Sequence, residues 1–251
     1  MSFLPATSWS QPLSVTPTSN RASKTGATPQ IKAMAFDAYG TLFDVYSVAA
    51  LGEQLFPGHG KDLSQLWRTN QLQYTWLRSL MGNYRDFEKV TSDGLVNACN
   101  KLKLDLTAEK RAQLMDAYNK LDTFPETKEA LKALSGIPLA ILSNGSPKML
   151  QAAVKSSGLE GFLSKVISVD EVKIFKPSPR VYQLALDHLP VKHREEIGFV
   201  SSNGWDAIGA ASFGLTTFWI NRADAPAEEL GIAPAGILHK LTDLVDIVKK
   251  G

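Results

Sequence analysis

The sequence has very little cysteine and histidine. Cys99 is the only cysteine among 251 residues, so the chain can form neither an internal disulfide nor a thiolate metal cluster. Cys99 lies in an apolar helical pattern, which is typical of a packed structural thiol. The histidines show no metal-ligand spacing, and we assign them no role: His59, His188, His193 and His239. These absences predict no metal site built on either residue type.

The sequence also lacks an excess of charge of one sign and long hydrophobic runs. The formal net charge is +2, and without a basic run it predicts neither nucleic acid nor a membrane surface as a partner. No apolar stretch approaches the length needed to span a membrane. With 44% hydrophobic and 21% charged residues, the chain can bury a core for one α/β domain plus a small subdomain. We expect a cytoplasmic protein whose partner is a small molecule.

Residues 1–30 have almost no charge and no hydrophobic periodicity. Ser, Thr and Pro dominate this segment, and Arg21 and Lys24 are its only charged residues. Such a composition cannot bury enough apolar surface to offset the entropy lost on ordering, so we expect a disordered extension. The segment lacks the apolar region of a secretory signal, and a transit-like leader remains an alternative interpretation.

The rest of the chain contains five short apolar runs that each end in polar residues. The first run, residues 31–36 (IKAMAF), ends at Asp37. The other four are residues 137–142, 166–169, 197–200 and 216–220. Runs of this length predict buried strands, and helical patterns lie between them. Strand alternating with helix favours a Rossmann-like α/β core, with a parallel sheet covered on both faces.

Serine, proline and glycine mark the ends of the predicted helices. The Ser-Pro pairs at 146–147 and 178–179 each place a capping hydroxyl before a proline that suits the first helical turn. Gly158 and Gly214 follow helical patterns and predict C-terminal stops. Both kinds of signal support helices between the predicted strands.

Residues 44–122 interrupt the alternation of strand and helix. This region has helical periodicity but no convincing strand, which predicts a helical cap subdomain inserted after the first strand. The core domain would then comprise residues 31–43 and 123–251. A cap that emerges beside Asp37 would be placed to act as a lid that excludes water from the chemistry.

Asp37 stands at the carboxyl end of the first predicted strand. Ligands of open α/β sheets bind in the crevice outside the carboxyl ends of the strands, so Asp37 is the candidate nucleophile. The alternative interpretation is that Asp37 only caps a helix or turn. Gly40 supplies a turn at the point where the chain must leave the sheet.

Four segments carry a shared sequence pattern. They are residues 37–44 (DAYGTLFD), 143–145 (SNG), 173–177 (KIFKP) and 201–206 (SSNGWD). Together they resemble the haloacid dehalogenase superfamily and, more narrowly, the hydrolytic L-2-haloacid dehalogenases. The resemblance implies a HAD-like fold and a homodimeric enzyme. It also implies hydrolysis of short (S)-2-haloacids to (R)-2-hydroxyacids and halide, with water as the second substrate and no cofactor or metal.

Tyr39 separates this chain from the phosphatases of the superfamily. Those enzymes usually carry a second aspartate two positions after the nucleophile, where it protonates the leaving alkoxide and helps to bind magnesium. A halide leaves as a stable anion and needs only positioned donors. Ser202 and Asn203 stand where metal-binding members often place an acidic residue, so magnesium would have too few oxygen ligands. A magnesium-dependent phosphatase and a catalytically silent binding protein remain the alternatives.

The resemblance implies roles for three charged residues. Asp37 would attack the halogen-bearing carbon and form an ester with inversion, after which water would hydrolyse the ester. Lys176 would supply the positive charge that keeps a buried Asp37 ionised. Arg68 would bind the halide and the substrate from the cap, and Arg78 and Arg85 are the arginines that could be confused with it.

Further residues complete the implied site. Asn144 and Trp205 would bind the halide. Ser143, with backbone N–H groups near Ala38 and Tyr39, would hold the substrate carboxylate. The residues that would position Asp37 and the hydrolytic water, with Tyr182 in support, are Thr41, Ser201, Asn203 and Asp206.

Two questions stay open at this level. Asp206 is the candidate to activate the water, but the sequence does not decide whether Asp206, Lys176 or Asn203 takes its proton. Four side chains would suit a dry wall around the reacting carbon and would suit ordinary core packing equally well: Tyr39, Leu72, Phe87 and Trp205.

Overall fold

The computed structural model describes residues 30–250 of the chain. The extension predicted for residues 1–30 therefore lies outside the described residues, apart from Gln30. Within the described part of the chain, no helix is both long enough and apolar enough to cross a lipid bilayer.

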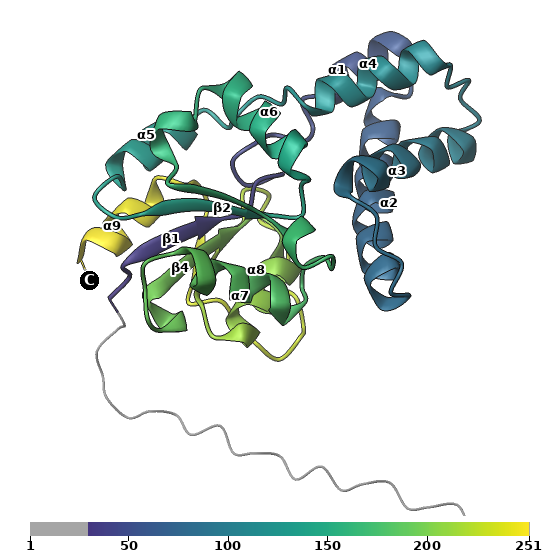
Figure 1. The fold of residues 1–251 in the computed structure, drawn as a ribbon. Coiled ribbons are helices and arrows are strands. Elements are labelled where there is room, and N and C mark those ends of the chain that lie inside the picture. The colour runs from purple at the N-terminus through teal and green to yellow at the C-terminus, as the bar shows by residue number, and fades with distance from the viewer. Residues whose placement is uncertain (1–29, 251) are drawn as a thin grey trace, which may run out of the picture.

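A parallel six-stranded sheet forms the centre of the fold, with strand order β3-β2-β1-β4-β5-β6 (Figure 1). The strands are β1 (Ala33–Phe36), β2 (Leu139–Ser143), β3 (Lys165–Ser168), β4 (Ile197–Ser201), β5 (Thr216–Ile220) and β6 (Gly236–Leu238). Every residue of the three central strands β2, β1 and β4 is buried. Burial on both faces explains why their sequences are continuous apolar runs without polar alternation.

The five predicted strands correspond to β1 to β5, and β6 was not predicted. β6 has three residues, pairs only with β5 at the edge of the sheet, and exposes Ile237 to solvent. Such a short edge strand begins with glycine and contains no buried apolar run, so its sequence carries no strand signal.

Helices cover both faces of the sheet, as the alternating pattern predicts. The helices that pack around the sheet are α5 (Thr127–Ala133), α6 (Pro147–Ser157), α7 (Pro179–His188), α8 (Gly204–Phe213) and α9 (Asp243–Lys250). Three short 3-10 turns accompany them: η1 (Glu160–Phe162), η2 (Val169–Glu171) and η3 (Arg194–Glu196). Figure 1 shows α5 and α6 on one face and α7 and α8 on the other. The α/β fold class is confirmed.

Most of the predicted helix signals act as expected. The Ser146 hydroxyl accepts a hydrogen bond from the N–H of Met149, and Gly158 and Gly214 end α6 and α8 with φ of +66° and +105°, a region that glycine enters without strain. The prediction of a capping hydroxyl at Ser178 was wrong. The N–H of Val181 bonds to the backbone carbonyl of Ser178 instead.

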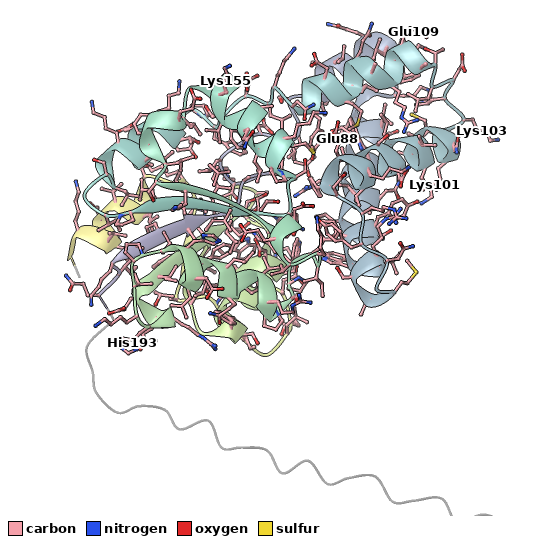
Figure 2. The ribbon with its side chains drawn as sticks, in the orientation of Figure 1. Glu88, Lys101, Lys103, Glu109, Lys155 and His193 are labelled. Carbon is pink, nitrogen blue, oxygen red and sulfur yellow. The ribbon has the colours of Figure 1, made fainter. Side chains whose placement is uncertain are left out.

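Of the five helices between β1 and β2 in the sequence, the first four stand apart from the sheet in Figure 1. They are α1 (Ala49–Leu55), α2 (Gly60–Leu80), α3 (Phe87–Leu102) and α4 (Ala108–Tyr118). We refer to them as the cap helices, and the exact division at residues 44 and 122 stays a prediction. Charged side chains on α3 and α4, such as Lys101 and Glu109, point outward (Figure 2).

The cap helices bury apolar side chains that belong to the same hydrophobic core as those of the sheet layer. Leu63, Val90, Leu95 and Cys99 are each at most 1% exposed. Burial raises the pKa of the Cys99 thiol to about 11, so the thiol stays protonated and inert at neutral pH. This agrees with the expected structural role of the lone cysteine.

Candidate active site

Asp37 lies directly after β1, and both of its carboxylate oxygens are hydrogen-bonded. Its backbone N–H donates to the carbonyl of Val200 on the neighbouring strand, at 2.8 Å, so the sheet fixes its position. Oδ1 accepts from Lys176 Nζ at 3.1 Å, and Oδ2 accepts from Thr41 Oγ1 and Asn203 Nδ2, both at 3.1 Å. Gly40, with φ of +91°, turns the chain away from the sheet. The carboxylate is therefore held in one orientation.

Lys176 lies between two buried carboxylates. Its Nζ is 3.1 Å from Asp37 Oδ1 and 2.9 Å from Asp206 Oδ2. Burial alone would lower the pKa of Lys176, but the neighbouring Asp206 and Asp37 outweigh it and raise that pKa. Burial, together with the negative charge of Asp37, raises the pKa of Asp206. One ammonium thus stabilises two carboxylates that are otherwise shielded from water.

Tyr182 secures the far side of this cluster. Its hydroxyl donates to Asp206 Oδ1 at 2.7 Å. Burial and the nearby Asp206 raise the pKa of Tyr182 well above its usual value, so the phenol remains a donor. Tyr182 touches Asp206 rather than Asp37, and it therefore positions the cluster from behind.

Residues 201–203 bind the loop that follows Asp37. The N–H of Ser202 donates to Thr41 Oγ1 at 2.9 Å, and the N–H of Asn203 donates to Ser201 Oγ at 3.1 Å. Thr41 in turn restrains the Asp37 carboxylate, because its hydroxyl donates to Asp37. The carboxyl ends of β1 and β4 are thus linked by side chains, as expected for neighbouring parallel strands.

Arg68 reaches the site from α2. Its Nη2 donates to the carbonyl of Tyr39 at 3.2 Å and lies 3.4 Å from Asn203 Oδ1, while Nη1 donates to Gln71 Oε1 at 2.7 Å. The two competing arginines lie elsewhere: Arg78 pairs with Asp93, and Arg85 donates to the carbonyl of Tyr84 on the surface. Of the three arginines, the structure brings only Arg68 to Asp37.

The loop after β2 supplies Ser143 and Asn144. Ser143 is fully buried, and its Oγ accepts the N–H of Gly145 at 3.1 Å. Asn144 Oδ1 accepts the N–H of Lys176 at 3.0 Å, which ties this loop to the lysine loop. Trp205 packs edge-on against Trp76 of α2, with ring centroids 5.3 Å apart.

A small cavity joins these side chains, with a volume of ≈ 10 Å³. It is lined by Asp37, Tyr39, Arg68, Leu72, Phe87, Ser143, Asn144, Lys176, Asn203 and Trp205. All four residues expected to form a dry wall are among them. A space of this size admits about one water molecule, so the lining side chains pack closely around Asp37.

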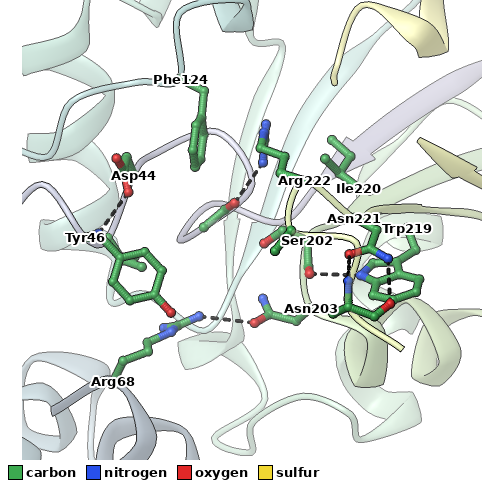
Figure 3. A pocket seen from close by; sticks show the side chains of 14 residues that line it. Asp44, Tyr46, Arg68, Phe124, Ser202, Asn203, Trp219, Ile220, Asn221 and Arg222 are labelled. Carbon is green, nitrogen blue, oxygen red and sulfur yellow. Dashed lines mark hydrogen bonds between the residues drawn. The ribbon is translucent and has the colours of Figure 1, made fainter. Parts of the chain in front are cut away.

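A larger cavity of ≈ 430 Å³ lies next to the small one and shares Arg68 and Asn203 with it. Figure 3 shows these two side chains in direct contact, with Arg222 bonded to the loop after Asp37. Tyr46, which is 55% exposed, also lines this cavity. The contact between Arg68 and Asn203 therefore separates the catalytic cavity from a wider space.

The structure therefore brings together every residue predicted for the site, with Ala38 buried directly after Asp37. Sequence reasoning did not select Ser202, Gln71 or Tyr118. Ser202 lies inside the quoted SSNGWD segment. Gln71 follows Arg68 by three residues, a spacing that places two side chains on one helix face, and this is the signal that could have found it.

The chain matches known proteins along almost all of its described length. A family model for haloacid dehalogenase-like hydrolases matches residues 31–214. An (S)-2-haloacid dehalogenase of Pseudomonas sp. (strain YL) is 48% identical over 219 residues, which covers 86% of this chain and 94% of that protein. A haloacetate dehalogenase of Moraxella sp. (strain B) is 47% identical over 221 residues, covering 87% and 98%.

A solved structure is similar in three dimensions as well. The L-2-haloacid dehalogenase of Xanthobacter autotrophicus with chloropropionic acid covalently bound is 40% identical, with a TM-score of 0.82 and coverage of 88% of this chain and 99% of that one. These relatives are dehalogenases, which supports dehalogenation and not the phosphatase alternative. The chain belongs to the haloacid dehalogenase-like hydrolases and, within them, to the L-2-haloacid dehalogenases.

Proposed function

We propose that this enzyme hydrolyses short (S)-2-haloacids to (R)-2-hydroxyacids and halide. The observation that carries the proposal is the buried Asp37, held by Lys176 on one oxygen and by Thr41 and Asn203 on the other. A carboxylate so fixed, facing a cavity with an arginine in its wall, suits attack on the carbon of an anionic substrate.

In the first step, an oxygen of Asp37 displaces the halide from the 2-carbon. The carbon–halogen bond breaks as the new carbon–oxygen bond forms, so the carbon is inverted and the halide leaves with the electron pair. Arg68, Asn144 and Trp205 would stabilise the departing halide. Ser143 and the N–H groups near Ala38 would hold the substrate carboxylate.

In the second step, water attacks the ester carbonyl of Asp37. The alcohol oxygen of the hydroxyacid comes from Asp37, and the inverted carbon is left untouched. We assign the proton of the attacking water to Asp206, because burial raises its pKa and makes it a better base. The ester C–O bond then breaks, and the departing alkoxide takes up this proton. Lys176 and Tyr182 hold Asp206 in place for this transfer.

Halide release from racemic 2-chloropropionate tests the proposed function. We expect halide release to stop once about half of the substrate is consumed, to give (R)-lactate, and to be insensitive to a chelator. Asp37→Asn should reduce turnover by at least about a thousandfold. Asp86→Asn is the matched control, because Asp86 is an exposed N-cap of α3 that does not line the catalytic cavity, and asparagine caps helices equally well.

A single turnover in ¹⁸O-labelled water tests the covalent route separately. The label should enter Asp37 and be absent from the first hydroxyacid released. Label found directly in that hydroxyacid would contradict attack by Asp37. Chelator-sensitive release of phosphate without halide release would instead favour the phosphatase alternative.

The assembly and location of the enzyme are further parts of the proposal. Leu77, Leu80 and Met81 at the end of α2 are 50%, 85% and 65% exposed. An exposed apolar cluster of this kind supports contact with another protein surface, and we propose that it contributes to a homodimer. Sedimentation of the parent and of Leu80→Glu would test this. The cytoplasmic location stays a prediction.

A further inference from the structure

Gln71 is a buried polar residue of α2 that the proposed mechanism does not use. Its side chain is 0% exposed. The amide oxygen accepts from Arg68 Nη1 at 2.7 Å and from the Tyr118 hydroxyl at 3.0 Å, and the amide nitrogen donates to Thr91 Oγ1 at 2.7 Å. A buried amide with three partners from three helices is unusual for mere space filling.

The orientation of the Gln71 amide follows from its neighbours. The Thr91 hydroxyl donates to the carbonyl of Phe87 at 2.6 Å, so its single proton is used and it can only accept from Gln71. The amide nitrogen must therefore face Thr91, and the amide oxygen must face Arg68. The carbonyl of Phe87 on α3 thus fixes which group donates and which accepts in the hydrogen bonds that run from Thr91 through Gln71 to Arg68.

Two further features hold this arrangement in place. Burial raises the pKa of Tyr118, so its hydroxyl stays protonated and remains a donor to Gln71. Gly94 of α3 lets the two helices approach closely, because a Cβ there would lie 3.2 Å from the backbone nitrogen of Gln71. The packing of the cap helices therefore builds the acceptor for Arg68.

We propose that Gln71 is a positioning residue that aims the Arg68 guanidinium at the leaving halide. With Nη1 bound to Gln71, Nη2 faces the carbonyl of Tyr39 and Asn203 above the nucleophile. Arginine has several rotatable bonds, and a fixed acceptor removes the alternatives that point away from the site. This inference rests on the proposed function, in which Arg68 binds the halide.

The test compares Gln71→Leu with Asn70→Leu. Asn70 is the adjacent residue on α2, 1% exposed, and its amide donates to the carbonyl of Gly94, but it does not touch Arg68. We expect Gln71→Leu to lower kcat/KM for 2-chloropropionate by about 10- to 100-fold, the loss expected for a hydrogen bond to a charged group. Asn70→Leu should stay within about threefold of the parent despite a similar fall in Tm. Equal activity losses in the two variants would overturn the proposal.

The leaving group distinguishes positioning from a general structural role. Chloride is a poorer leaving group than bromide and depends more on Arg68, so the loss in Gln71→Leu should be larger for 2-chloropropionate than for 2-bromopropionate. If the ratio of kcat/KM for 2-bromopropionate to kcat/KM for 2-chloropropionate is the same in Gln71→Leu as in the parent, that result would count against the proposal. Thr91→Val keeps the shape of the side chain and removes the partner of the amide nitrogen. Thr91→Val should lower kcat/KM for 2-chloropropionate by about three- to tenfold, again with a smaller loss for 2-bromopropionate. The proposal therefore stays testable if Gln71→Leu fails to fold.

Bromide binding gives a readout that does not need turnover. Titration of intrinsic tryptophan fluorescence with bromide should show weaker binding to Gln71→Leu than to Asn70→Leu, because Trp205 lines the same cavity as Arg68. If the parent binds bromide but releases no halide from 2-chloropropionate, the proposed function fails while the role of Gln71 is still measured. Equal bromide affinity in both variants would reject that role.

Discussion

The active site has a sheet side and a cap side, and the two sides differ in how their charged groups are paired. On the sheet side, Asp37, Lys176 and Asp206 are each at most 6% exposed and form a buried ion cluster in which one ammonium faces two carboxylates. On the cap side, Arg68 is only partly buried, and its recorded partners are neutral: Gln71, the carbonyl of Tyr39 and Asn203. The sheet side thus holds the nucleophile, and the cap side offers an uncompensated positive charge to an anion.

This difference separates stability from substrate recognition. Removing the lysine from this cluster leaves two buried carboxylates without a cation and destabilises the fold. Removing a guanidinium with neutral partners leaves no buried charge behind. Changes on the sheet side should therefore alter both folding and turnover, whereas changes at Arg68 should alter turnover alone.

Lys176→Met should have the largest effect on both quantities. It leaves Asp37 and Asp206 buried without their shared cation, so we expect a loss of about 3–5 kcal/mol in the free energy of unfolding. kcat/KM for 2-chloropropionate should fall at least about a hundredfold, because Asp37 becomes harder to ionise. Urea unfolding and halide release measure the two effects.

Lys173→Met is the matched control for that change. Lys173 lies in the same loop but is 61% exposed and pairs with Asp170 at the surface. Surface pairs contribute little to stability, so unfolding and halide release should match the parent. A Lys176→Met protein as stable as Lys173→Met would show that Lys176 does not stabilise the two buried carboxylates as described.

Arg68→Lys should change activity without changing stability. Lysine keeps the charge but loses the planar fork that contacts Gln71 and Tyr39 together, so we expect kcat/KM to fall about 10- to 100-fold. Tm should stay close to that of the parent. Arg78→Lys on the same helix is the control, because Arg78 pairs with Asp93 away from the site. A large fall in Tm for Arg68→Lys would erase the contrast between the two halves.

The smallest effect is expected in the alkaline pH range. The pKa of Lys176 is raised above 10.5 in the folded protein. The stabilisation that it contributes is therefore fully present below its ordinary pKa and is lost as pH rises through the folded value. The difference in unfolding free energy between parent and Lys176→Met should stay constant from about pH 7 to 10 and shrink above about pH 10.5. An inflection near pH 8 would argue that another group controls the cluster.

Sequence patterns predicted the sheet side of the site well. Asp37, Ser143 and Ser201 each end or directly follow an apolar run, and parallel strands bring such positions to one edge. Their proximity therefore follows from fold class alone. Lys176 is different, because a loop lysine has no such geometric rule, and only the resemblance of the KIFKP segment indicated it.

The cap side was harder to predict because helix packing decides it. Arg68 and Arg78 lie on one helix, about 15 Å apart along its axis, and the sequence does not say which end meets the sheet. Gln71 and Tyr118 belong to separate helices, α2 and α4. Their contact depends on how the cap helices cross, which one sequence does not specify.

The small volume of the catalytic cavity bears on how the substrate enters the site. Its ≈ 10 Å³ leaves room for about one water molecule, so we expect the side chains around Asp37 to move aside when a haloacid binds. Bonds that bridge α2 and its following loop to the sheet layer, such as Tyr84 to Asp170 and Phe175 to Ser79, would then break and re-form each time. We expect this movement to limit turnover wherever it is slower than cleavage of the carbon–halogen bond.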